Sequence, residues 1–258
     1  MPKPQRGIQS IEVGGTLLQA LVDAGSPMPL RDLAQRAGMT SAKAHPYLVS
    51  YGKLGLIEQD PLTGHYGLGP FALRLGLVSL QLLSPVRIAI PLVTAFGDAV
   101  GHTVALAVLG SHGPTIVYIQ ESSRPIHVNM RAGTVMSTVN TATGRVFSAY
   151  LPAKLAQYYM ARELNDPAVT AQESTRRPKL ELEVLLDEVR EHGLARAVGQ
   201  PLPGINALSA PVFDQTRAIV LAVTVLGPAG SFDAAWNGSL AQALRACTQE
   251  ISLRLGYK

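Results

Sequence analysis

The sequence contains one cysteine, few aromatic residues and few charges. Cys247, the single cysteine, excludes an internal disulfide and any zinc site built from several cysteines, and it is typical of a protein from a reducing compartment. Aromatic residues make up 5% and charged residues 16% of the chain. Because about a quarter of an ordinary globular domain is charged, this composition predicts a largely neutral surface or one buried against partners.

Motifs that mark the common enzyme classes are also missing. The six histidines are scattered, with no HExxH pair, and there is no GxSxG elbow, Walker loop or GxGxxG turn. We therefore expect no catalytic residue, no metal site and no cofactor.

Long hydrophobic runs are absent as well. The N-terminus has no apolar core of signal-peptide length, and the longest uncharged run, 99–120, is broken by a Gly-Ser-His-Gly-Pro turn. The sequence thus predicts a cytoplasmic protein with no membrane partner.

What is present suffices for a well-packed core. The 258 residues are 47% hydrophobic with a mean hydropathy of +0.18, and their number corresponds to one large domain or two ordinary ones. The 22 basic and 18 acidic residues give a net charge of +4, which is compatible with a polyanionic partner.

The first 75 residues predict three helices followed by a β-hairpin. An apolar helical face from Ile11 to Val22 ends at Gly25, a short helix covers 30–37, and Thr40 can cap a third helix reaching about Leu54. Segments 56–59 and 65–68 form strands around a Pro-Gly turn. This order is that of a winged helix-turn-helix.

Such a domain places the N-terminal half of its third helix in the DNA major groove. Five residues are expected to be exposed there: Ser41, Lys43, Ala44, His45 and Tyr47. Further contacts are expected from Lys53 near the end of the helix, His65 at the wing tip and Arg6 in the N-terminal arm. The alternative interpretation is a three-helix bundle with a hairpin that serves protein interaction and does not bind DNA. The first 76 residues carry 7 basic and 5 acidic groups, a modest excess for a DNA-binding domain.

Pro46 lies within the predicted third helix. A proline there removes one backbone hydrogen bond and costs roughly 3 kcal/mol relative to alanine. Two alternatives follow: the regular helix starts late, with Pro46 in its first turn, or it is kinked at Pro46.

The rest of the chain mixes helices and strands. A connecting helix is expected over 71–83, further helices over 92–100, 143–151, 153–164 and 179–192, and a final helix from about Leu240. Strands are expected over 103–109, 115–121, 126–130, 207–213 and 218–226. Helices packed on an antiparallel sheet make this part α+β.

A polar turn, Thr141-Ala142-Thr143-Gly144-Arg145, opens one of these helices. Unpaired N–H groups and the positive end of the helix dipole suit a carboxylate at this point. Simple capping by Thr141 or Thr143 is the alternative explanation.

These stretches resemble the IclR family of bacterial transcriptional regulators. The similarity is carried by PLRDLAQRAGMTSAKAHPYLVSYGKLGLIEQDPLTGHYGLGPFALRLG in residues 29–76, and by TATGRVF and GINALSAPVFD further on. It implies an α+β fold with a winged helix-turn-helix in 1–69, a linker helix in 70–85 and a GAF-like effector-binding and oligomerisation domain in 86–258. It also implies operator DNA, a small-molecule effector and a homodimer or dimer of dimers as partners. Val13 and Pro46 stand where members commonly carry an arginine.

The resemblance also assigns an effector pocket. By residue-wise transfer it consists of Met136, Thr138, Asn140, Ala142, Thr143, Ala197, Ala207, Thr224 and Leu226. Because most of these positions are apolar, the expected effector is an aromatic or alicyclic acid with its carboxylate at Ala142 and Thr143. The alternative function is a metabolite-binding or catalytic protein whose winged helix serves only dimerisation.

Overall fold

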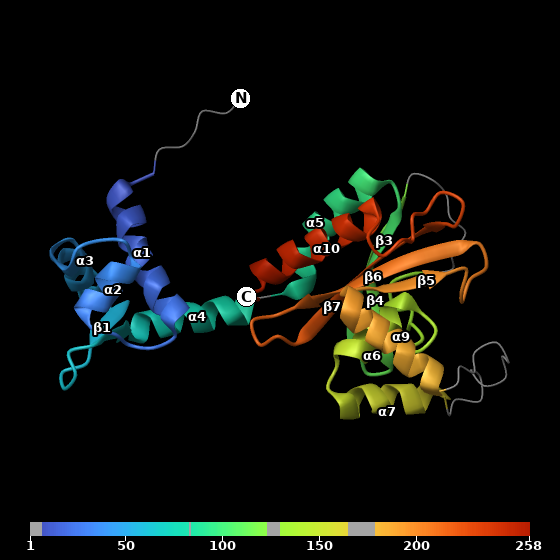
Figure 1. The fold of residues 1–258 in the computed structure, drawn as a ribbon, viewed down its shortest axis with the longest axis horizontal. Coiled ribbons are helices and arrows are strands. Elements are labelled where there is room, and N and C mark those ends of the chain that lie inside the picture. The colour runs from blue at the N-terminus through green and yellow to red at the C-terminus, as the bar shows by residue number, and fades with distance from the viewer. Residues whose placement is uncertain (1–6, 83, 123–129, 165–178) are drawn as a thin grey trace. The chain divides into compact units, whose positions relative to one another are not determined.

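The computed structural model describes residues 7–82, 84–122, 130–164 and 179–258. Two compact units, Met1–Leu83 and Ser84–Lys258, make up the chain (Figure 1). No helix in the described ranges is long and apolar enough to cross a membrane.

The first unit contains the predicted helices and hairpin. Its elements are α1 Gln9–Ala24, α2 Leu30–Arg36, α3 Ser41–Lys53, β1 Ile57–Gln59, β2 Tyr66–Leu68 and α4 Pro70–Leu82. α1 ends at Gly25, whose φ of 65° is the left-handed conformation expected of a glycine at that position. β1 and β2 pair antiparallel, with Ile57 opposite Leu68.

Three helices and the hairpin of this unit enclose a small apolar core. Leu17, Leu33, Leu48 and Ile57 are all at most 2% exposed in it. Gly14 lets α1 approach α3 closely, because a Cβ there would lie 2.4 Å from the Tyr51 hydroxyl oxygen. The residues that face away from this core are therefore the ones available for binding.

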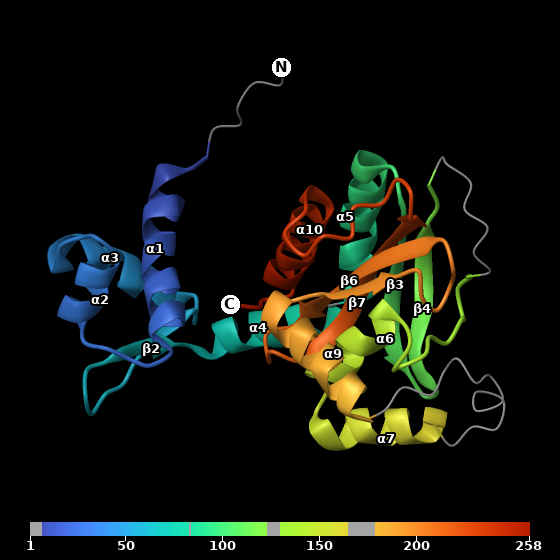
Figure 2. The same cartoon turned by 45° about the vertical axis from the view of Figure 1, so that its right-hand side comes forward.

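The second unit is a five-stranded antiparallel sheet between two layers of helices. The strand order is β4-β3-β7-β6-β5. The strands are β3 Thr103–Gly110, β4 Gly113–Gln120, β5 Ala195–Val198, β6 Ile205–Phe213 and β7 Ile219–Pro228, and the helices are α5 Pro85–Val100, α6 Ala142–Tyr150, α7 Ala153–Leu164, α9 Lys179–His192 and α10 Ser239–Arg254. α5 and α10 cover one face, and α6 with α9 cover the other (Figures 1 and 2).

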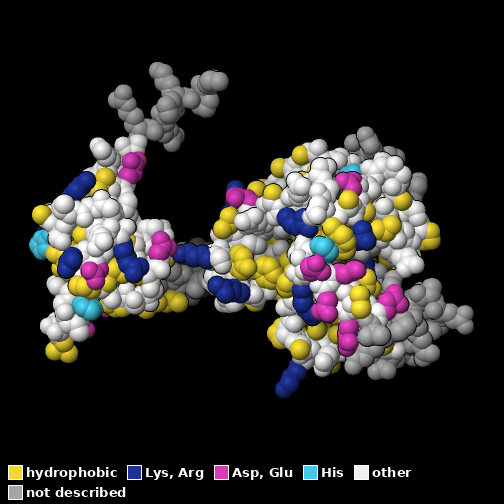
Figure 3. Space-filling view, viewed as in Figure 1, with side chains coloured by type: hydrophobic (Ala, Val, Ile, Leu, Met, Phe, Trp, Pro, Cys, Tyr) yellow, Lys and Arg dark blue, Asp and Glu magenta, His cyan; other side chains and the backbone are white. Residues whose placement is uncertain are grey.

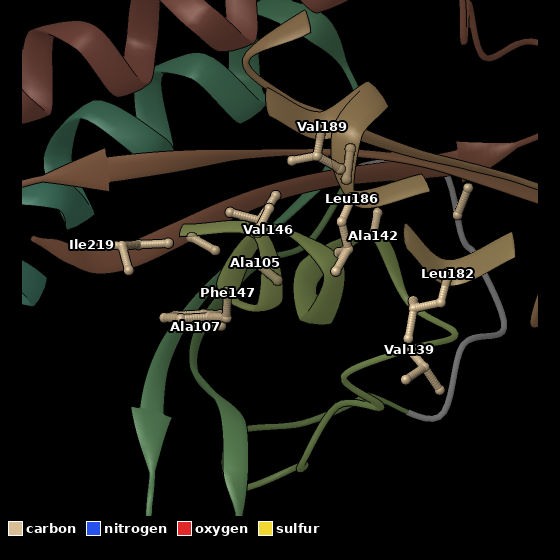
Figure 4. Packing of buried hydrophobic residues seen from close by; sticks show 14 of the residues in the cluster. Ala105, Ala107, Val139, Ala142, Val146, Phe147, Leu182, Leu186, Val189 and Ile219 are labelled. Atoms are coloured by element: carbon tan, nitrogen blue, oxygen red, sulfur yellow. The ribbon is translucent and has the colours of Figure 1, made fainter. Parts of the chain in front are cut away.

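Alternation along the strands builds a separate core on each face. On β3, Ala105 and Ala107 belong to the cluster that includes Val146 and Phe147 of α6, as Figure 4 shows. Their neighbours Val104 and Leu106 are equally buried but lie outside that cluster, because successive side chains point to opposite faces of a sheet.

Three sequence expectations need correction or fall outside the described residues. α5 begins at Pro85, well before the expected residue 92, and continues through Pro91. Pro91 lies on the exposed side of the helix, so water can solvate the backbone carbonyl that it leaves without a hydrogen bond. β5 was not predicted. Residues 126–129 of the strand expected over 126–130 lie outside the described ranges.

Candidate functional site

α3 starts where its cap predicts. The hydroxyl of Thr40 accepts the N–H of Lys43 at 3.3 Å, and the helix runs from Ser41 to Lys53. Lys43, His45 and Lys53 are exposed and Ser41 is partly exposed. Lys, Arg and His side chains lie on the face of this unit that includes α3, with some acidic ones among them (Figure 3).

Of the residues predicted to be exposed on α3, one faces the core of this unit and another is half-buried. Ala44 is 0% exposed and packs in the same cluster as Leu48, one turn further on, so the prediction that Ala44 is exposed is wrong. Positions four apart lie on one helix face, and that face is the buried one. Tyr47 is half-buried against the core, which leaves part of its side chain accessible.

Pro46 lies inside α3 and on its exposed side. Since the helix begins at Ser41, the alternative of a late start at Pro46 is wrong. The residue whose carbonyl loses its partner, Ala42, is itself exposed, so water can replace the missing N–H. The hydroxyl of Ser50 donates to the Pro46 carbonyl at 3.0 Å.

The tip of the hairpin is held by one carboxylate. Asp60 Oδ1 accepts the backbone N–H groups of Thr63 and Leu62, each at 2.8 Å, and these bonds hold the pKa of Asp60 below its usual value. Gly64 completes the turn with a φ of 70°. His65 follows on the tip and is partly exposed, whereas Arg6 lies outside the described residues.

The second unit contains a cavity of about 140 Å³ between the sheet and the start of α6. Its floor is a row of apolar side chains across three strands: Ala197 of β5 pairs with Ala207 of β6, which pairs with Leu226 of β7. The lining consists of Met130, Thr134, Met136, Thr141, Ala142, Thr143, Ala197, Gln200, Pro201, Leu202, Ile205, Ala207, Thr224 and Leu226. The small alanine side chains leave the space that larger residues would fill.

Seven of the nine residues predicted for the pocket line this cavity, but Thr138 and Asn140 do not. Both are buried in the turn before α6 and take part in its internal bonding. The N–H and hydroxyl of Thr138 donate to the Glu163 carboxylate, and the N–H of Asn140 donates to the hydroxyl of Ser137 at 2.9 Å.

The cavity is also lined by a loop that was not predicted to be part of the site. Gln200, Pro201 and Leu202 connect β5 to β6 and line the cavity together with Ile205. Ile205 stands two residues before Ala207, and this period of two could have placed it on the same sheet face. The loop residues carry no such pattern.

The first residues of α6 line the cavity. The Thr141 hydroxyl accepts the Gly144 N–H at 2.9 Å, and the Arg145 N–H donates to the Thr141 carbonyl at 3.0 Å. The first N–H groups of a helix, here those of Ala142 and Thr143, have no intrahelical acceptor. Since both residues line the cavity, a ligand's carboxylate can accept from them.

Buried hydroxyls join this helix to the sheet. Thr143 Oγ1 lies 2.7 Å from Thr224 Oγ1, and the Thr224 hydroxyl donates to Ser209 Oγ at 2.9 Å. The guanidinium of Arg145, only 5% exposed, donates to the Arg196 carbonyl on β5 at 2.8 Å. The polar end of the cavity is therefore fixed from two strands.

Cys247 packs on α10 beside α5, and its Sγ lies 4.0 Å from the Leu92 carbonyl oxygen. Burial raises the pKa of its thiol to about 11, which makes it a poor nucleophile. Within the described ranges, no group of three or more His, Cys, Asp or Glu side chains is arranged to hold a metal ion.

Comparison with known proteins matches both units. Residues 10–61 match the IclR helix-turn-helix domain model, and residues 79–253 match the model of the bacterial transcriptional regulator IclR C-terminal domain. The glycerol operon regulatory proteins of Streptomyces griseus and Streptomyces coelicolor are 30% and 29% identical to this chain, in each case over 97% of it and 98% of the relative. The crystal structure of Pseudomonas aeruginosa HmgR superposes with a TM-score of 0.86 at 35% identity, over 97% of this chain and 99% of that one.

Proposed function

Because the chain belongs to the IclR family of bacterial transcriptional regulators and carries its DNA-binding helix-turn-helix, we propose that a small carboxylic acid in the cavity controls how it binds operator DNA. Its relatives are transcriptional regulators, which supports this function over the alternative of a metabolite-binding or catalytic protein whose winged helix serves only dimerisation.

The proposed DNA contacts come from α3 and the hairpin. Ser41, Lys43 and His45 supply donors at the start of α3, where side chains reach base edges and phosphates in the major groove. The accessible part of Tyr47 extends this surface. Further proposed phosphate contacts, beside that of Lys43, are Lys53, His65 and, in the N-terminal arm, Arg6.

The effector that suits the cavity is an aromatic or alicyclic acid. The observation that carries this proposal is that the cavity is lined mainly by apolar side chains and also by Ala142 and Thr143, the first two residues of α6. An apolar cavity of about 150 Å³ admits a benzene ring, and the volume of this cavity, about 140 Å³, is close to that size. The ring would lie against Ala197, Ala207 and Leu226, with its carboxylate at the N–H groups of Ala142 and Thr143.

Calorimetric titration against a panel of acids tests this chemistry. Benzoate and cyclohexanecarboxylate should bind more tightly than glyoxylate, acetate or pyruvate, because only a ring displaces all the water from the apolar part of the cavity. Tight binding of the two- and three-carbon acids alone would overturn the proposal.

We further propose a homodimer or a dimer of dimers, with α4 as part of its interface. Along α4, Phe71, Leu73, Leu75, Leu77 and Val78 are 40–64% exposed, which is an unusual apolar surface for a helix facing only water. A second copy would cover it and pair the winged helices for two half-sites. Sedimentation equilibrium of the wild type and of a Leu73→Glu, Leu77→Glu variant tests this, since the variant should dissociate to smaller species.

Control by the effector then requires that it bind one arrangement of the paired winged helices better than another. An acid with equal affinity for both arrangements shifts nothing, however tightly it binds. The effect of the acid on DNA affinity is therefore the quantity to measure.

A further inference from the structure

Glu163 binds the turn that leads into α6. It lies near the end of α7 and is half-buried. Its carboxylate accepts the N–H of Thr138 at 2.6 Å and the hydroxyls of Ser137 and Thr138. Neither the cavity lining nor the DNA-facing surface includes this residue, so its three-donor bonding calls for another explanation.

The same turn is bonded to the start of α6. Ser137, whose hydroxyl Glu163 accepts, offers its carbonyl oxygen to the Thr141 hydroxyl at 2.7 Å. Thr141 in turn accepts the Gly144 N–H at 2.9 Å. A continuous series of hydrogen bonds therefore runs from the α7 carboxylate to the first turn of α6, where the cavity has its donors.

Close packing makes this connection stiff. A Cβ on Gly144 would lie 1.9 Å from the Ser137 carbonyl oxygen, so the turn is pressed directly against α6. The Ser148 hydroxyl also donates to the Thr138 carbonyl at 3.0 Å. The turn cannot shift without displacing the beginning of the helix.

α7 is anchored to the sheet by other groups. The Tyr159 hydroxyl donates to the Gly110 carbonyl and the Arg162 guanidinium to the Ser111 carbonyl, both at 3.0 Å, and Ala156 is buried beneath the helix. These contacts already hold α7 on the β3–β4 turn. The bonds of Glu163 therefore stabilise the turn before α6 more than they hold α7 in place.

We propose that Glu163 is a positioning residue of the effector cavity. It fixes the direction of the Ala142 and Thr143 N–H groups. Because its own carboxylate accepts from Ser137 and Thr138, the N–H groups of Ala142 and Thr143 are the ones that bind the ligand's carboxylate. This inference rests on the proposed function in one respect, namely that an acid binds at α6.

Amide hydrogen exchange in the intact protein tests it without a ligand. In Glu163→Ala the N–H groups of Thr138, Asn140 and Gly144 should exchange at least tenfold faster than in the wild type. The matched control is Arg162→Ala, one residue earlier on the same helix, which should stay within twofold. Formate added to Glu163→Ala should restore slow exchange, because a free carboxylate can occupy the vacated donors.

Binding of benzoate gives the second arm, with at least a tenfold loss of affinity expected in Glu163→Ala and less than twofold in Arg162→Ala. Unchanged exchange in Glu163→Ala, equal acceleration in both variants, or exchange that stays fast in formate would each overturn the inference. If neither benzoate nor cyclohexanecarboxylate binds the wild type, the effector proposal fails, while the exchange measurements still decide the role of Glu163.

Discussion

The hydroxyls of Thr143 and Thr224 lie 2.7 Å apart although 81 residues separate them in the chain. Thr143 lies in the first turn of α6 and Thr224 in the middle of β7. The Thr224 hydroxyl also donates to the hydroxyl of Ser209 on β6. All three side chains are at most 6% exposed. This buried chain of hydroxyls holds the donor end of the cavity against its apolar floor.

Replacing Thr224 with valine should destabilise the protein. The shape is kept, but Thr143 and Ser209 lose a buried partner, which costs about 1–3 kcal/mol per unsatisfied group. Urea unfolding measures the change in the free energy of unfolding. Thr216→Val is the control, since Thr216 lies in an exposed turn where water replaces its bond to Asp214. Equal stability of both variants would contradict the role given to the hydroxyl chain.

Gly144→Ala should abolish binding of acids in the cavity. The new Cβ would meet the Ser137 carbonyl oxygen at 1.9 Å, and a backbone atom cannot move aside as a flexible side chain can. The turn and the start of α6 must then separate. Gly15→Ala is the control, because a Cβ there meets nothing within 4 Å and alanine favours the helix. Titration with benzoate separates the two variants; retained binding in Gly144→Ala would contradict the geometry.

Local signals in the sequence predicted most of the fold. Gly25 and Thr40 delimit helices through their own conformation or hydroxyl, so a few neighbouring residues suffice to place these boundaries. The lining residues on the strands followed from residue-wise transfer from the family, and Ala197 and Ala207 turn out to be direct cross-strand partners.

Other features depend on contacts that no local pattern encodes. Ala44 is buried because α3 turns that face toward Leu17 and Leu33, and a small residue is compatible with either face. Pro91 does not end α5, since its side of the helix is exposed. Thr138 was expected to line the cavity, yet its N–H is bound by Glu163, 25 residues later in the chain.

Lys43→Ala should weaken binding to operator DNA and leave acid binding intact. Lys43 is exposed in the first turn of α3. Loss of one phosphate contact should make the negative slope of log affinity against log salt concentration shallower by about 1. Fluorescence anisotropy with the intergenic DNA upstream of the gene, at several salt concentrations, measures this. Lys154→Ala, an exposed lysine on α7, is the control. An unchanged salt slope in Lys43→Ala would remove this residue from the interface.

Cys247 should react slowly in the folded protein. Burial raises the pKa of its thiol from 9.0 to about 11, so alkylation by iodoacetamide at pH 8 should be far slower than in the unfolded chain and should accelerate as the pH approaches 11. Because the folded pKa is the higher one, the stability linked to this thiol is complete below pH 9 and is lost as the pH rises toward 11. Cys247→Ala should lack this pH dependence. Equal alkylation rates in folded and unfolded protein at pH 8 would contradict the burial.

The most direct test of the whole account is the affinity for upstream DNA measured with and without a saturating acid that binds the cavity. The wild type should change its affinity at least tenfold, in either direction. Ala207→Phe, which fills the cavity floor, should bind DNA as tightly as the acid-free wild type and show no response to the acid. An acid that binds the wild type without altering its DNA affinity, or that acts equally on Ala207→Phe, would contradict control of DNA binding through this cavity.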